Sequence, residues 1–327
     1  MSQLVRDFGD PVEEARSCRS DSALFDFSFV YRLRLSGANV IAEMEDFQPR
    51  RVSDMVTGQI RYSVKLNRQG RVRSDLTLWR LGEGVFEIMS GCQADAIELL
   101  SLSDESFRVE DLSEQSAIIA IQGDNALLKL GQFMDVEAIK TLPYFHFTGA
   151  QIAGHDCVIG RLGYSGEKGF EIIVEQSHKS FLWERLCDVV RPAGLAALDI
   201  LRIEAGFFLF THECRIAPGI DELGLASFFD LDEADAEIRF TAFKASSRAD
   251  MTLWQPTSST VRRPDAGEIS VTSACYSPYF DSVIGLGFVP TGNKNSIHTD
   301  PDGVFHSIEI QAAPLFDPAK IKPRQGW

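Results

Sequence analysis

The sequence has little that would place the protein in a membrane or outside the cell. No run approaches the roughly 18 apolar residues of a membrane span, and the N-terminal stretch MSQLVRDFGDPVEEARS lacks the apolar core of a secretory signal peptide. Basic charge is also scarce, because 32 Lys and Arg stand against 47 Asp and Glu and give a net charge of -15. Such a field repels nucleic acid and anionic membrane surfaces. We therefore expect a cytoplasmic protein with no nucleic-acid or membrane partner.

Clustered cysteines and metal-ligand spacings are lacking too. The six cysteines are scattered and form no Cys-x-x-Cys pair, which argues against a zinc knuckle or a dense disulfide framework. We expect reduced, structural thiols and no metal site. The remaining composition is ordinary for a globular protein: 327 residues, 44% hydrophobic and 24% charged. This is enough for two or three domains with a sizeable buried core.

The most informative stretch is RLGYSGEKGFEI, residues 161–172. Apolar residues on both sides predict two strands, and glycines at 163, 166 and 169 predict a tight turn between them. Glycine serves where the backbone needs a positive φ or where another group approaches it closely. A carboxylate beside such a turn, Glu167 or Glu171, can accept paired N–H donors from a flat heterocycle. The local pattern also fits an ordinary hairpin with two solvated glutamates.

A second informative stretch covers residues 56–80. Two alternating runs, IRYSVKL and VRSDLTLW, flank the turn NRQG and predict a β-hairpin. Side chains alternate along a strand, so Asp75 shares a face with Arg73, Thr77 and Trp79. Asp75 therefore lies on the same face of the strand as Arg73, and its side chain could point into a pocket.

The chain also contains a weak internal echo. The segment VYRLRLSGANVIAEMEDF and the segment SAIIAIQGDNALLKLGQF both read as a strand, a glycine and an amphipathic helix. Such an echo predicts two related βαβ-type halves. After DLDEADAEIRF, residues 230–240, which we interpret as an acidic solvated linker or edge, short strands and many turns predict a small β-barrel or sandwich. We place the boundary between residues 1–240 and residues 241–327.

These segments resemble the folate-binding aminomethyltransferase family, which includes the T-protein of the glycine cleavage system. The stretch at 161–172 matches its G-Y-T/S-G-E-x-G-x-E-I signature, and the hairpin matches G-Q-x-x-Y…N-x-x-G-x-x-x-D-L. LAALDILRIEAG, residues 195–206, is similar to A-R-D-x-L-R-x-E-A-G, and further matches continue to the closing P-F-Y-D-P segment. The resemblance implies an α+β fold with two related α/β halves around a central cleft, followed by a small C-terminal β-barrel domain.

The resemblance also implies a set of site residues. Glu171 would hold the pterin ring of tetrahydrofolate, and Asp75 would be the catalytic residue beside the reacting folate nitrogens. Tyr62 and Tyr164 would cover the face of the ring. Arg202 would point into the central cavity, and the alternative from its spacing is an intrahelical salt bridge with Asp199, one turn away. Glu167 is interpreted as an ordinary turn residue.

The function implied is tetrahydrofolate-dependent transfer of a one-carbon unit from a small-molecule amine-type or sulfonium-type donor, with a lipoyl-carrier protein as a further candidate partner. The basic cluster around the hairpin is either an anion site, for a substrate carboxylate or a folate glutamate tail, or a set of solvated strand edges. Its members are Arg50, Arg51, Arg61, Lys65, Arg68, Arg71 and Arg73.

Departures from the family pattern leave two alternatives open. Phe29 replaces a common histidine, Ser74 an aspartate, Ala197 an arginine and Thr211 a glycine, and the usual F-I-G-K segment is missing. One alternative is a non-catalytic folate-binding accessory protein for iron–sulfur assembly or repair, although its K-G-C-Y-x-G-Q-E motif is not found. The other is a degenerate member that binds a different flat acid.

Overall fold

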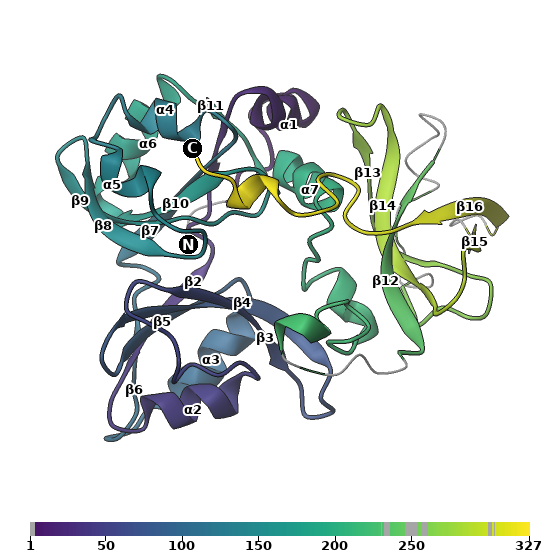
Figure 1. Ribbon diagram of the computed structural model, residues 1–327, viewed down its shortest axis with the longest axis horizontal. Helices are drawn as coiled ribbons and strands as arrows, with labels where there is room; N and C mark the ends of the chain where they lie inside the picture. The colour runs from purple at the N-terminus through teal and green to yellow at the C-terminus, as the bar shows by residue number, and fades with distance from the viewer. Residues whose placement is uncertain are drawn as a thin grey trace.

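The computed structural model describes residues 4–229, 231, 236–245, 254, 256, 261–299, 303 and 305–327. Of the acidic stretch at residues 230–240, residues 230 and 232–235 lie outside the described residues, and residues 238–240 are not a linker, because they begin a strand of the C-terminal sheet. Three sheets organise the chain (Figure 1). Among the described residues, no helix is both long and apolar enough to cross a membrane.

The first half is a five-stranded antiparallel sheet covered on one face by two helices. Its strand order is β3-β4-β5-β2-β6. Buried side chains such as Met44, Leu78 and Leu99 join the helices to the sheet in one apolar cluster. The elements are β2 (Tyr31–Ser36), α2 (Val40–Phe47), β3 (Ile60–Leu66), β4 (Val72–Gly82), β5 (Val85–Ser90), α3 (Gln93–Ser101) and β6 (Arg108–Asp111).

The second half repeats this plan with six strands in the order β11-β1-β7-β10-β9-β8. Helices α4 and α6 cover its outer face, where Leu130 and Leu182 of the helices share an apolar cluster with Phe170 of the sheet. The elements are β1 (Ala23–Asp26), β7 (Ser116–Gln122), α4 (Ala126–Leu130), α5 (Glu137–Lys140), β8 (Phe147–Ile152), β9 (His155–Gly160), β10 (Gly169–Glu175), η1 (Gln176–His178), α6 (Lys179–Cys187) and β11 (Arg191–Pro192).

The internal echo in the sequence corresponds to equivalent turns in the two halves. Gly37 between β2 and α2 has φ +121°, and Gly123 between β7 and α4 has φ +127°. A Cβ atom would lie 2.3 Å from the carbonyl oxygen of Ser106 at Gly37 and 2.4 Å from that of Asp21 at Gly123. Both turns therefore require glycine. In the first half, α3 connects the parallel strands β5 and β6, and β2 lies between them. In the second half, α6 connects the parallel strands β10 and β11, and β7 and β1 lie between them. The expectation of two related halves is therefore confirmed.

The C-terminal part is a five-stranded sheet that curls on itself. Its order is β13-β14-β12-β16-β15, and its two edges are bridged because Ile297 N–H donates to Gly267 and Ile269 N–H donates to Ile297. This sheet is the small C-terminal β domain that was expected. Its strands are β12 (Ile238–Lys244), β13 (Ser270–Ser277), β14 (Ser282–Pro290), β15 (Asn295–Thr299) and β16 (Phe305–Gln311). Since β12 begins at residue 238, we propose a boundary just before it.

Helices α1 (Pro11–Ser20) and α7 (Leu195–Glu204) connect the three parts. Helix α1 has Pro11 in its first turn, and the Asp10 carboxylate accepts hydrogen bonds from two backbone N–H groups at its start. Helix α7 packs against α1 and against β13 and β14. Beyond β16 the chain runs back across the molecule, and Trp327 stacks on Phe170 with ring centroids 5.0 Å apart (Figure 1). Short 3-10 turns lie at Glu213–Ile216, Ala226–Phe228 and Lys322–Arg324.

The helix-free faces of the first two sheets contribute to one apolar cluster. Ile60 and Trp79 enter it from the first sheet, and Ile118, Ala120 and Ile173 from the second. Figure 1 shows the consequence, with α2 and α3 outside one sheet and α4 and α6 outside the other. Tyr62, Asp75 and Glu171 lie on these inner faces, whereas Tyr164 lies in the loop before β10 and Arg202 on α7.

Candidate functional site

Strand β4 presents Asp75 on the inner face of its sheet. Leu76 and Leu78 belong to the cluster beneath helices α2 and α3, whereas Trp79 packs inward against Phe147 at a ring-centroid distance of 5.1 Å. The alternation predicted from the sequence is therefore confirmed. Asp75 shares the inward direction of Trp79 and is half-buried.

The Asp75 carboxylate lies in an environment that disfavours its charge. Burial raises the pKa of Asp75 to about 7, and the negative charges of Asp95 and Glu213 add to this effect. Among the described residues, no side chain donates a hydrogen bond to Asp75. Arg73 does not neutralise it, because its guanidinium binds Asp95 at 2.6 Å and Glu98 at 2.9 Å. A half-buried carboxylate with a pKa near neutrality is typical of a functional group.

Tyr62 and Tyr164 lie close to Asp75. Burial raises the pKa of both phenols well above the usual value, and the charge of Asp75 is the next cause for each. Tyr164 donates its hydroxyl to the carbonyl of Phe208 and stacks on Phe207 with centroids 5.6 Å apart. Its ring is therefore held in place from two directions.

Strand β10 places Glu171 on the inner face of the second sheet. Its backbone pairs with Ala120 of β7 and Gly160 of β9. Burial raises the pKa of Glu171 to about 7, and its carboxylate has no hydrogen-bond or ion-pair partner among the described residues. Glu171 also contributes to raising the pKa of Tyr144, after burial. Nothing in the sequence pattern singled out Tyr144.

Replacing Glu171 with glutamine is expected to stabilise the free protein at pH 8. The folded-state pKa lies above the unfolded value of 4.5, so the contribution of this carboxyl group to stability is present below about pH 4.5 and is lost as the pH rises through about 7. Above that pH, the amide avoids the free-energy cost of burying a poorly solvated charge, which is roughly 1 to 3 kcal/mol. Thermal unfolding should show a higher Tm for Glu171→Gln at pH 8 and little difference at pH 4. An unchanged or lower Tm at pH 8 would contradict the assigned environment.

The glycine-rich turn at residues 163–169, the signature turn, is built around the buried side chain of Gln122. A Cβ atom would lie 1.8 Å from Gln122 Oε1 at Gly163 and 2.6 Å from Gln122 Cδ at Gly169. Ser165 donates its hydroxyl to Gln122 Oε1 at 2.9 Å, and Gly166 has φ +78°. The regular glycines are therefore needed for close packing and for backbone conformation.

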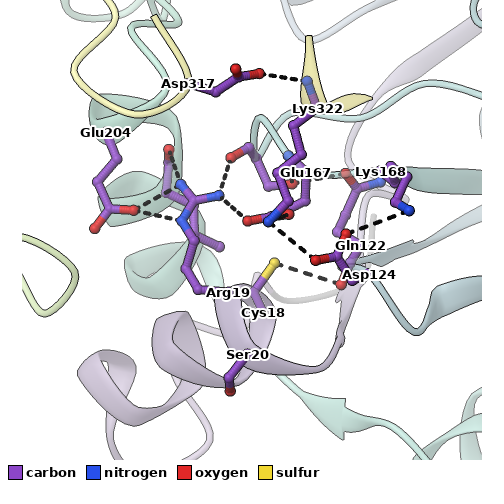
Figure 2. A network of polar contacts seen from close by, with 12 residues as sticks. Cys18, Arg19, Ser20, Gln122, Asp124, Glu167, Lys168, Glu204, Asp317 and Lys322 are labelled. Atoms are coloured by element: carbon purple, nitrogen blue, oxygen red, sulfur yellow. Dashed lines mark hydrogen bonds and ion pairs between the residues drawn. The ribbon is translucent and has the colours of Figure 1, made fainter. Parts of the chain in front are cut away.

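Glu167 is not an ordinary turn residue, and this prediction was wrong. Its side chain is 1% exposed and binds Arg19 at 2.9 Å and Lys322 at 2.6 Å. Figure 2 shows Lys322 reaching Glu167 from the C-terminal segment, with Asp124 at 3.3 Å from the same ammonium. The signature turn is thus joined to both ends of the described chain.

Arg19 connects two buried glutamates. Its guanidinium lies between Glu167 and Glu204, and the closest contact with Glu204 is 2.7 Å (Figure 2). Burial lowers the pKa of Arg19, but the charges of Glu204 and Glu167 outweigh burial and raise it above its usual value. Its guanidinium carbon also lies 3.7 Å from the ring centroid of Phe316. This cluster fixes α1, α7, the signature turn and the C-terminal segment relative to one another.

Arg202 is 1% exposed and its five N–H donors all face protein acceptors. Nε and Nη2 bind Asp199 at 2.8 and 2.7 Å, so the intrahelical pair forms. Nη1 binds Glu213 at 3.1 Å and the Phe207 carbonyl at 3.3 Å, and Nη2 also donates to Ser273 at 2.6 Å. Direct contact with a cofactor stays a prediction, and this geometry favours a positioning role.

Arg202 also orders residues that the sequence pattern did not indicate. Glu213 is fully buried and accepts from Leu209 N–H and from the hydroxyls of Thr272 and Ser273. It therefore links α7 to β13 and adds negative charge beside Asp75. Over the described ranges, no group of three or more His, Cys, Asp or Glu is arranged to hold a metal ion.

Known proteins share both the sequence pattern and the fold. The family model of the GCVT N-terminal domain matches residues 7–233. An aminomethyltransferase of Synechocystis sp. is 30% identical over 340 residues, covering 97% of this chain and 91% of that protein. An aminomethyltransferase of Burkholderia mallei is 33% identical over 253 residues, covering 74% and 68%. The crystal structure of glycine cleavage system aminomethyltransferase T from Bartonella henselae has a TM-score of 0.78 at 23% identity, covering 96% and 92% of the two chains, and shows the same fold.

Proposed function

Because the chain belongs to the aminomethyltransferase family that contains the GCVT N-terminal domain, we propose that it transfers a one-carbon unit from an amine-type donor to tetrahydrofolate. The observation that carries this proposal is the pair of half-buried carboxylates, Asp75 and Glu171, on the inner faces of two sheets. Both have a pKa of about 7, and neither accepts a hydrogen bond from another side chain of the described residues. Buried carboxylates normally have partners, so a ligand that supplies donors fits both.

Glu171 has the chemistry to hold a pterin ring. Two adjacent N–H donors of a flat heterocycle would pair with its two oxygens and relieve the burial of its charge. Tyr62 and Tyr164, which lie near Asp75, offer aromatic surface for the ring. The backbone of Glu171 is held between two neighbouring strands, so the carboxylate is placed on a rigid element.

Asp75 has the chemistry to assist transfer. Its carboxylate would stabilise positive charge that develops at the reacting nitrogens, or remove a proton from them. Tetrahydrofolate supplies those nitrogens when it is bound. Asp95 and Glu213 add to the effect of burial in raising the pKa of Asp75, and this suits a group that takes up a proton near neutral pH. The relatives carry the name aminomethyltransferase, which supports an amine-type donor.

Calorimetry with tetrahydrofolate tests the proposal directly. The wild-type protein should bind, and Glu171→Gln should weaken binding at least about tenfold, because one charge-assisted pair of contacts is worth about 1.5 to 3 kcal/mol. Glu175→Gln on the same strand is the matched control, since Glu175 is exposed and should leave the affinity unchanged. No detectable binding to the wild type would overturn the proposed function.

A further inference from the structure

A β-bulge in the C-terminal sheet aims two consecutive hydroxyl groups at one carboxylate. The pairing of β13 with β14 shifts its register between Val271 and Ser273. Consecutive side chains of a regular strand point to opposite faces, yet Thr272 and Ser273 both donate to Glu213 Oε1. All three of these side chains are buried. Bulges re-aim side chains in this way and are frequent next to active sites.

The second oxygen of Glu213 holds the chain that follows α7. Glu213 Oε2 accepts from Leu209 N–H at 2.7 Å and from Arg202 Nη1 at 3.1 Å. Arg202 Nη1 also donates to the Phe207 carbonyl at 3.3 Å, and Nη2 donates to the Ser273 hydroxyl at 2.6 Å. The segment from Phe207 to Leu209 is therefore fixed jointly by α7 and by the bulge in β13.

This segment in turn holds Tyr164 of the signature turn. The Tyr164 hydroxyl donates to the Phe208 carbonyl, and its ring stacks on Phe207 with centroids 5.6 Å apart. Glu213 begins a 3-10 turn that packs against β4, the strand that carries Asp75. A shift of the segment would therefore displace the Tyr164 ring relative to Asp75.

The polar character of this network indicates that it specifies geometry. Apolar side chains of similar volume can join a helix to a sheet with equal or greater stability than a buried ion pair. A buried polar network whose members all have partners instead fixes one arrangement of the groups that it joins. Arg202, Glu213 and Ser273 are each buried and each hydrogen-bonded to the other two. The arrangement that they fix is that of the segment holding Tyr164.

We propose that Glu213 and Ser273 are positioning residues for Tyr164, through which the C-terminal sheet helps to place the ring of the bound folate. Ser273 orients Glu213 and Arg202, these two fix the segment from Phe207 to Leu209, and the segment fixes Tyr164. The inference rests on the proposed function, because Tyr164 is taken to cover the pterin ring. It gives the C-terminal domain a part in the site that requires no contact between that domain and the ligand.

Calorimetry with tetrahydrofolate on the full chain tests the two positioning residues. Ser273→Ala keeps every charge but removes the hydroxyl shared by Arg202 and Glu213, and it should weaken binding about three- to tenfold. Glu213→Gln should weaken binding by more than about tenfold, because its amide nitrogen cannot accept from Leu209 or Arg202. Ser296→Ala is the matched control: Ser296 is a buried serine of β15 in the same sheet, and its hydroxyl has no hydrogen-bond partner within the described residues. It should bind as the wild type does.

A double-variant cycle with Tyr164→Phe shows whether Ser273 acts through Tyr164. The phenylalanine keeps the ring but loses the hydrogen bond to the Phe208 carbonyl. Adding Ser273→Ala to Tyr164→Phe should then weaken binding by less than about twofold, because the segment no longer holds the ring through that bond. A hydroxyl that only stabilised the fold would lower the Tm and leave this coupling at zero. Thermal unfolding of each variant sets a temperature at which all of them are folded for the binding measurement.

The outcomes separate this inference from the proposed function. Wild-type affinity in Ser273→Ala would overturn the inference while leaving the proposed function standing, and so would losses that simply multiply in the double variant. Failure of the wild type to bind tetrahydrofolate would overturn the proposed function and this inference together.

Discussion

Replacing Asp75 with asparagine is expected to lower kcat by a factor of about 10² to 10⁴, the usual range for removing an electrostatic or general-base group. The amide keeps the size of the side chain but removes its charge and its capacity to accept a proton. Tetrahydrofolate should still bind, because Glu171 is unchanged. Steady-state kinetics with an amine donor and calorimetry on the same variant would separate turnover from binding.

The pH dependence sharpens this test. Since the pKa of Asp75 is about 7, the wild-type rate should rise with pH through that value as the carboxylate loses its proton, and the rise should be absent in Asp75→Asn. Burial raises the folded-state pKa, so this carboxyl group stabilises the protein only at low pH and its contribution is lost as the pH rises through about 7. The variant should therefore not melt earlier at pH 8, and lost turnover would not reflect unfolding.

Asp156→Asn is the control for Asp75→Asn, because Asp156 is exposed on β9. It should behave as the wild type in rate and affinity. If Asp75→Asn turns over normally with every accepted donor, the catalytic assignment is wrong. Folate binding without any turnover in the wild type would instead favour the non-catalytic alternative.

Much of the fold could be predicted because its signals are local. Asp10 and Pro11 mark the start of α1, and the glycines at 37 and 123 mark the same strand-to-helix turn in both halves. The position of β1 could not be predicted in this way. Residues 23–26 precede the first half in sequence but pair with β7 and β11 in the second sheet, and no local pattern encodes that long-range pairing.

In the candidate site, too, the features that could be predicted depend on local sequence and the others depend on long-range contacts. The side of the sheet on which Asp75 lies follows from alternation along one strand, which is local information. The burial of Glu167 depends on Arg19 and Lys322, which lie 148 and 155 positions away along the chain. The partners of Arg73 and Arg202 depend likewise on α3 and β13. Sequence spacing shows that such charges can pair, but it does not show which acceptor is present in the fold.

Arg19→Met is expected to lower the free energy of unfolding by about 3 to 5 kcal/mol, and the Tm by roughly 5 to 10 °C. Methionine preserves much of the aliphatic length but removes the cation shared by Glu167 and Glu204. Glu167 keeps Lys322 as a partner, whereas Glu204, which is fully buried, has no other salt bridge among the described residues. Thermal and denaturant unfolding would measure the loss. Arg16→Met, one turn earlier on α1, is the control, because the Arg16 pair with Glu13 is solvent-exposed and worth under about 1 kcal/mol.

A second substitution separates the charge effect from a packing effect. If the loss in Arg19→Met comes from the buried charge of Glu204, then adding Glu204→Gln should recover a large part of it, because a neutral amide costs less to bury than a carboxylate without a cation. If the double variant is no more stable than Arg19→Met, the role of Arg19 is packing against Phe316 instead. Because Arg19 also binds the Ser165 carbonyl at 2.8 Å in the signature turn, Arg19→Met should weaken tetrahydrofolate binding at temperatures where the protein is still folded. Unchanged affinity there would show that the turn holds Glu171 in place without α1.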